Sequence, residues 1–135
     1  MPNYQGVWSL TTQMQNVSDW PEQPIGGGGR AVFSIGVLNS SIVNTMEFTT
    51  ILTGSTFTDF GDATVTSQAR NSLSSDTRGV TAGGTNSSTN VMDYVTLASA
   101  GNSTDFGDLT RTKHFVMAAS NATRGLFGGG FAADS

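Results

Sequence analysis

The sequence contains no cysteine and few charged residues. Without cysteine the chain can form neither a disulfide nor a thiolate metal site, so its stability has to come from packing or assembly. Charged residues make up only 12% of the 135 residues, the net charge is −4, and lysine and arginine form no cluster. We therefore expect neither nucleic acid nor an anionic membrane as a partner.

Long apolar runs are also missing. No segment reaches the roughly eighteen apolar residues of a membrane-spanning helix, so we expect no membrane span. The N-terminus lacks the basic and then apolar pattern of a secretory signal peptide, which predicts synthesis in a cytosol. Glycine is abundant, with 17 residues, and serine, threonine and asparagine are frequent. This composition favours strands and turns over helices.

The strongest pattern in the sequence is a repeat. The segment TDFGD occupies residues 58–62 and again residues 104–108, an offset of 46 residues. The same offset aligns residues 46–84 with residues 92–130 without a gap. The chain therefore contains two copies of one unit.

A third, partial copy lies upstream of the two units. RAVFSIG at 30–36 matches RGVTAGG at 78–84 and RGLFGGG at 124–130. The connection that follows the first of these segments is two residues longer than the connection that follows the second. The order along the chain is therefore strand, unit, strand, unit, strand.

Short strands separated by turn residues are expected within each unit. We expect one strand over 80–82, an alternating strand over 91–97 and a third strand over 109–119. A repeat of this length built from several short strands is typical of the four-stranded blades of a β-propeller. The sequence therefore predicts an all-β protein with two propeller blades in each chain.

The repeats also resemble a known family. An arginine, a strand ending in Gly-Gly, the strand VMDY and the aromatic residue of DFGDLT are similar to the kelch-type blade, where tryptophan usually stands at the place of Phe60 or Phe106. DFGDL and TRGLFGGG are closer still to kelch-like repeats of phage structural and tail-associated proteins. The resemblance covers about residues 30–130. It departs from the family pattern at Ile35, Thr81 and Ala82.

The N-terminal segment, residues 1–25, differs from the repeats and contains both tryptophans. It precedes a glycine linker at 26–29, and we expect the two blades and a terminal strand at 30–135. The run GVW followed by WP resembles a short N-terminal module of phage appendage proteins. This resemblance implies an adapter that docks to another virion protein or a sister subunit through Trp8 and Trp20. We expect Tyr4 and Val7 at the same interface, because their spacing places them on one helical face with Trp8. The alternative is that the tryptophans cover the core of the propeller itself.

The repeated acids and arginines each have two interpretations. The acids of TDFGD are turn residues that accept backbone N–H groups while the phenylalanine inserts between blades, or they bind calcium, although the glutamate and spacing of an EF-hand are missing. Arg78 and Arg124 pair with carboxylates of the neighbouring blade, such as Glu47 or Asp93, or they line the mouth of a ligand site. The expected inter-blade residues are Asp59, Phe60, Asp62, Arg78, Asp105, Phe106, Asp108 and Arg124.

No pattern of catalytic residues is present. His114 is the only histidine, and no serine near it lies in an activated motif. GGGGR at 26–30 suggests a phosphate cradle, but no Lys-Ser or Lys-Thr pair follows, so we assign the glycine runs to backbone requirements. We therefore expect no enzyme, no catalytic residue, no cofactor and no metal ion.

Two blades are too few for a closed ring. Propellers close with about four to eight blades, so two blades leave unpaired strand edges that copies of the chain can satisfy, with segment 124–130 completing a blade of the next subunit. The resemblance to phage appendages, which are commonly trimeric, implies three chains and six blades.

The expected function is that of a phage virion structural protein, assembled in the host cytoplasm. In the appendage or tail-fibre form, the N-terminal segment docks to the particle and the propeller binds host glycan through loop residues Asn39, Ser40, Asn86 and Ser87. The alternative is a capsid decoration, cement or knob protein that binds no host ligand.

Overall fold

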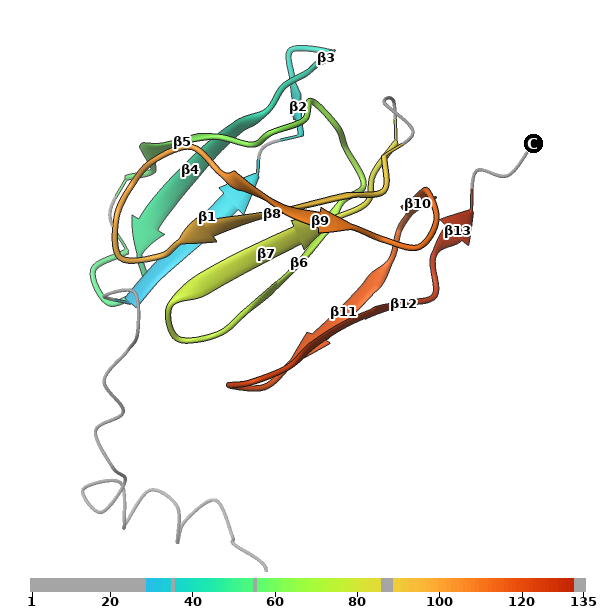
Figure 1. The fold of residues 1–135 in the computed structure, drawn as a ribbon. Coiled ribbons are helices and arrows are strands. Elements are labelled where there is room, and N and C mark those ends of the chain that lie inside the picture. Colours follow the sequence, from blue (N-terminus) through green and yellow to red (C-terminus); the bar gives the residue numbers. More distant parts are fainter. Residues whose placement is uncertain (1–28, 35, 55, 86–88, 133–135) are drawn as a thin grey trace, which may run out of the picture.

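The computed structural model describes residues 29–34, 36–54, 56–85 and 89–132, and the regular structure in these ranges is β-strand (Figure 1). The all-β class predicted from the sequence is therefore confirmed. The expected adapter at 1–25 and residues 26–28 of the linker lie outside the described residues. No helix in the described ranges is long and apolar enough to cross a lipid bilayer.

A four-stranded antiparallel sheet, the middle sheet, lies between two smaller ones. Its strands are β6 (Asn71–Ser74), β7 (Arg78–Ala82), β8 (Val91–Thr96) and β9 (Thr104–Asp108), and they pair in this order. Each strand pairs with its neighbour in the sequence, as short loops between antiparallel strands allow. Ser75 helps to close the β6–β7 turn, because its backbone N–H donates to the Arg78 carbonyl at 2.9 Å.

A three-stranded sheet, the first sheet, precedes the middle one along the chain. It consists of β1 (Arg30–Ser34), β4 (Thr45–Thr50) and β5 (Thr58–Asp62), in this order. Between β1 and β4 the chain forms a small hairpin of β2 (Val37–Leu38) and β3 (Ser41–Ile42).

A two-stranded sheet, the third sheet, follows the middle one. It consists of β11 (Met117–Ser120) and β12 (Gly125–Gly128), and β10 (Lys113–His114) pairs with β13 (Phe131–Ala132) next to it in the sequence. Asn121 closes the β11–β12 turn. Its side-chain Oδ1 accepts hydrogen bonds from the backbone N–H groups of Thr123 and Arg124 at 2.9 Å and 2.8 Å.

The three sheets follow one pattern. The offset of 46 residues relates β4 to β8, β5 to β9, β6 to β11 and β7 to β12, and an offset of 48 relates β1 to β7. The pairing register agrees, because Phe33 lies opposite Glu47 in the first sheet as Thr81 lies opposite Asp93 in the middle sheet. Within the described residues the first sheet has no counterpart of β6, and the third sheet has none of β8 or β9.

Two sequence-based expectations about local structure are wrong. TDFGD is not a turn but a strand, β5 in one copy and β9 in the other. It looks like a turn because its glycine serves a β-bulge, at which the pairing register shifts between Met46 and Glu47 and again between Met92 and Asp93. The single strand expected over 109–119 is divided into β10 and β11, and Phe115 between them has a φ of 53°.

The apolar core lies between the first and middle sheets. Met46, Phe60, Ala63 and Val95 are buried together there. The partly buried side chains that pack against this cluster are Val32, Phe48 and Leu97. Because both sheets contribute side chains to this core, one face of the first sheet packs against one face of the middle sheet (Figure 1).

Candidate functional site

Besides the apolar core, a loop joins the first and middle sheets. The β8–β9 connection, residues 97–103, lies against β5 and bonds to its backbone. The Gly101 N–H donates to the Phe60 carbonyl at 2.6 Å, and the Ser103 N–H donates to the Asp62 carbonyl at 2.8 Å. The Asp62 N–H donates in turn to Asn102 Oδ1 at 3.0 Å. This joint therefore fixes the bulged end of one sheet to the loop of the next.

Gly61 admits this loop because it has no side chain. A Cβ on Gly61 would lie 2.5 Å from the Gly101 carbonyl carbon and 2.8 Å from the Asn102 nitrogen. Its φ of 134° is also a value that residues with a Cβ rarely adopt. The glycine of TDFGD is thus required both by the bulge and by the neighbouring loop.

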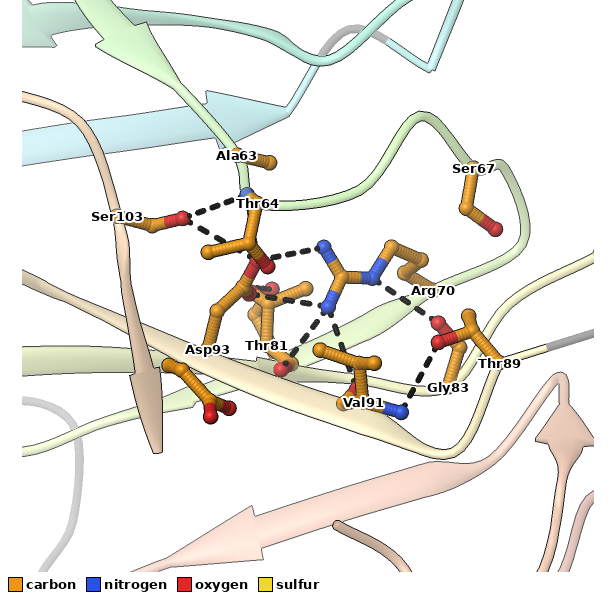
Figure 2. A network of polar contacts seen from close by, with 12 residues as sticks. Ala63, Thr64, Ser67, Arg70, Thr81, Gly83, Thr89, Val91, Asp93 and Ser103 are labelled. Carbon is orange, nitrogen blue, oxygen red and sulfur yellow. Dashed lines mark hydrogen bonds and ion pairs between the residues drawn. The ribbon is translucent and has the colours of Figure 1, made fainter. Parts of the chain in front are cut away.

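A buried ion pair lies beside the joint (Figure 2). Arg70 Nη2 is 3.0 Å from Asp93 Oδ1, and the two side chains are only 4% and 2% exposed. The Arg70 guanidinium also donates to three backbone carbonyls of the middle sheet and its adjoining loops. These carbonyls belong to Thr81, Gly83 and Val91. Every side of the arginine is therefore engaged.

Asp93 connects the ion pair to the first sheet. Thr64, which follows β5, donates its backbone N–H at 3.0 Å and its hydroxyl at 2.7 Å to Asp93 Oδ2. Burial on its own raises the pKa of the Asp93 carboxyl, but the hydrogen bonds from Arg70 and Thr64 and the charge of Arg70 outweigh it. The pKa of Asp93 therefore lies below its ordinary value. A carboxylate held in this way positions sheets and is poorly suited to exchange protons with a substrate.

The sequence did not single out this ion pair. The repeat suggests Asp93 as a partner for Arg78, but in the structure Asp93 pairs with Arg70, which has no repeat-equivalent arginine. At the offset of 46 residues Val116 stands in its place, and Glu47 stands in the place of Asp93. A search for repeated residues misses a charge that occurs in one unit only.

Arg78 makes a different contact from the expected ones. Its guanidinium lies over the Tyr94 ring, 4.7 Å from the ring centroid. Arg30 lies over Phe48 in the same way at 4.8 Å, and the strand offsets make these two pairs equivalent. The repeated arginine thus covers the aromatic residue of the next strand. Arg124 holds the same place at the start of the third copy, where the described residues include no such strand.

The other predicted residues do not form a common binding site. Asn39 and Ser40 have φ values of 48° and 64°, typical of a type I′ hairpin turn, while Asn86 and Ser87 lie outside the described residues, as do Tyr4, Val7, Trp8 and Trp20. The acids Asp59, Asp62, Asp105 and Asp108 are exposed on β5 and β9. Within the described ranges no three histidine or carboxylate side chains gather as a metal site would need.

Two hollows accompany the sheets. A cavity of about 260 Å³ lies between the first and middle sheets and includes Arg70 and Asp93 in its wall. A groove of about 400 Å³ runs between β1 and the segment that leads into β6. The groove lies beside β1, which is an edge strand of the first sheet.

Some equivalent residues of the two units differ strongly in how far they are exposed to solvent. Phe60 is 2% exposed under the 97–103 loop, whereas Phe106 is 52% exposed. Gly61 is crowded, whereas a Cβ on Gly107 would meet only the Met92 side chain, at 4.0 Å. We call Phe106, Gly107 and Asp108 the acceptor face, because its counterpart on β5 receives a loop.

The loop equivalent to 97–103 is also uncovered. Leu97 packs against the core, but its counterpart Ile51 is 62% exposed and the neighbouring Leu52 is 78% exposed. Phe57, the counterpart of Ser103, is exposed as well. We call the described residues 51–54 and 56–57 the donor loop. The chain thus carries one complete joint and, separately, exposed counterparts of both its halves.

Comparison with known proteins adds no assignment. No family model matches this chain, and no curated protein matches it significantly. The acceptor face and the donor loop are therefore the features on which a function can be argued.

Proposed function

We propose that this chain is a non-enzymatic structural protein that assembles with copies of itself into a propeller-like ring of β-sheets. The observation that carries the proposal is the contrast between Phe60 and Phe106. Phe60 is buried because the 97–103 loop covers it, whereas the equivalent Phe106 is exposed because no loop covers it. In the proposed assembly, a second copy supplies the loop that covers Phe106.

The two exposed surfaces suit one another because the joint between the first and middle sheets already shows the fit. In an assembly the donor loop of one copy lies on the acceptor face of the next, and the Phe57 N–H reaches the Asp108 carbonyl as Ser103 reaches Asp62. Burying Phe106, Ile51 and Leu52 removes apolar surface from water. Donor and acceptor differ, so the contact is head to tail, and it gives a ring when the rotation from one copy to the next closes.

The resemblance of the repeats to kelch-like phage proteins extends the proposal to a virion component. In this role the ring belongs to an appendage or tail fibre, with three chains supplying six blades. Quantitative mass spectrometry of purified particles would then find the chain in fixed proportion to other virion proteins. Enrichment in lysate but not in particles would contradict the virion role and leave the assembly intact.

The solution mass of the purified chain tests the assembly. We expect a trimer by light scattering, and a monomer for Phe106→Asp, because a charge on the acceptor face opposes burial. Leu38→Asp is the matched control, since Leu38 is an exposed apolar residue on the β2–β3 hairpin. A monomeric wild-type chain, or equal effects of the two substitutions, would overturn the proposal.

A further inference from the structure

The first and third sheets together contain one strand too many for one complete sheet. In the middle sheet the four places are filled by β6, β7, β8 and β9. β11 and β12 fill the first two places, whereas β1, β4 and β5 fill the last three. If two copies join the third sheet of one to the first sheet of the other, β12 and β1 compete for the second place.

The start of β12 suits the edge of β4. Arg30 at the start of β1 lies over Phe48 of β4, and Arg124 stands immediately before β12 at the equivalent position. The middle sheet repeats this pair as Arg78 over Tyr94. Arg124 therefore finds at Phe48 of a second copy the aromatic ring that its own sheet lacks among the described residues.

A second match distinguishes β12 from β7. Phe33 of β1 packs edge to face against Phe57, with ring centroids 5.5 Å apart. In the middle sheet these two positions are Thr81 and Ser103. At the position of Phe33, β12 carries Phe127. β12 therefore carries a phenylalanine that suits packing against Phe57, whereas β7 carries Thr81 at this position.

The groove beside β1 provides the place for β11. It lies at the free edge of the first sheet, between Val32–Ser34 and Gln68–Ser72. β11 is tied to β12 by four opposed residue pairs and by the turn that Asn121 closes. When β12 lies on β4, the hairpin therefore brings β11 to the first place of the sheet.

We propose that β12 of one copy replaces β1 at the edge of β4 in a second copy, so that β11, β12, β4 and β5 form a four-stranded sheet shared by two chains. This inference rests on the proposed assembly and names its strand exchange. Five residue pairs between β1 and β4 are given up, and the register of the middle sheet supplies five in return, with Phe127 opposite Glu47. The exchange therefore changes the number of backbone hydrogen bonds little. Burial of the donor loop and the acceptor face in the assembly favours it.

Engineered disulfides test this exchange in a chain that has no cysteine of its own. Glu47→Cys with Phe127→Cys reports β12 on β4, and Glu47→Cys with Phe33→Cys reports β1 on β4. The two double variants are matched, because each removes one of the two equivalent phenylalanines. We expect brief oxidation of the assembled fraction to link chains in the first variant and to leave the second unlinked. Glu47→Cys with Leu126→Cys is the register control, since Leu126 points to the opposite face of its strand.

The outcomes separate this inference from the proposed function. Linked chains in the Phe127 variant, without a bond in the Phe33 variant, support the exchange. A bond within each chain of the assembled Phe33 variant overturns the exchange and leaves the assembly standing. Equal linkage in the Leu126 control also overturns it, because random collision then explains the bonds. A wild-type chain that is monomeric at every concentration overturns both proposals.

Discussion

Asp93 is the residue through which a buried charge connects two sheets. It lies on β8, it is paired with Arg70 from the segment that leads into β6, and it accepts two hydrogen bonds from Thr64, which follows β5 of the first sheet. A buried carboxylate is tolerated only while such partners remain. Its contribution is therefore to alignment of the sheets, and its removal is felt at the joint.

Arg70→Met tests the cost of leaving this carboxylate without its ion partner. We expect the free energy of unfolding to fall by about 3–5 kcal/mol, because Asp93 stays buried and unpaired. Urea unfolding monitored by circular dichroism measures the loss. Asp76→Asn, an exposed charge removal near the same strands, changes stability by less than about 0.5 kcal/mol. A loss equal to that of Asp76→Asn would show that the pair is not coupled to folding.

The lowered pKa of Asp93 predicts how stability depends on pH. In the unfolded chain the carboxyl binds a proton near its ordinary pKa of 3.8, whereas in the folded chain it binds one only at lower pH. Its contribution is thus complete above about pH 4 and is lost as the pH falls through the folded-state pKa. We expect the stability difference between wild type and Asp93→Asn to shrink as the pH is lowered through the range below about pH 4. A difference that stays constant over this range would refute the assignment.

At the level of strands, the repeat made much of the architecture predictable. The offset of 46 residues correctly indicates equivalent strands, and Phe60 is buried in the core between the first and middle sheets. The prediction of a turn at TDFGD is wrong because glycine and aspartate favour turns, whereas here glycine serves a bulge inside a strand. The sequence does not indicate Arg70, because its partner Asp93 lies farther along the chain on β8 and the position of Arg70 is not repeated as an arginine. Local composition cannot show a contact made across a sheet.

Gly61→Ala and Gly107→Ala compare the same bulge with and without a neighbour. Both residues have nearly the same φ, 134° and 131°, so each substitution costs about 1–3 kcal/mol in backbone strain. Only Gly61 also contacts a loop, so Gly61→Ala should lower the free energy of unfolding more than Gly107→Ala does. Urea unfolding at a concentration that keeps the chain monomeric measures the two losses. Gly107→Ala should instead weaken assembly. Equal stability losses and unchanged assembly would contradict the role given to the joint.

For the whole molecule, a head-to-tail contact predicts complementation between two defective chains. Phe106→Asp removes the acceptor face and Leu52→Asp alters the donor loop, so each variant alone is expected to stay monomeric. Mixed in equal amounts, they retain one intact joint between them and should form a dimer that goes no further. Sedimentation velocity measures the three samples. Assembly of Leu52→Asp by itself would indicate a face-to-face contact of Phe106 surfaces instead.

Because β1 and β12 compete for the same edge of β4, β1 affects how the proposed ring begins to form. While a newly made chain is alone, β1 occupies the edge of β4 that would otherwise attract any extended peptide. Under the proposed exchange this strand must leave before a partner can enter, so the speed of ring formation is set by an event inside one chain. Growth would then be slow at first and insensitive to concentration once partners are plentiful. Under the proposed exchange, β1 therefore has two effects: it covers the edge of β4 in the lone chain, and its release sets the rate at which the ring forms.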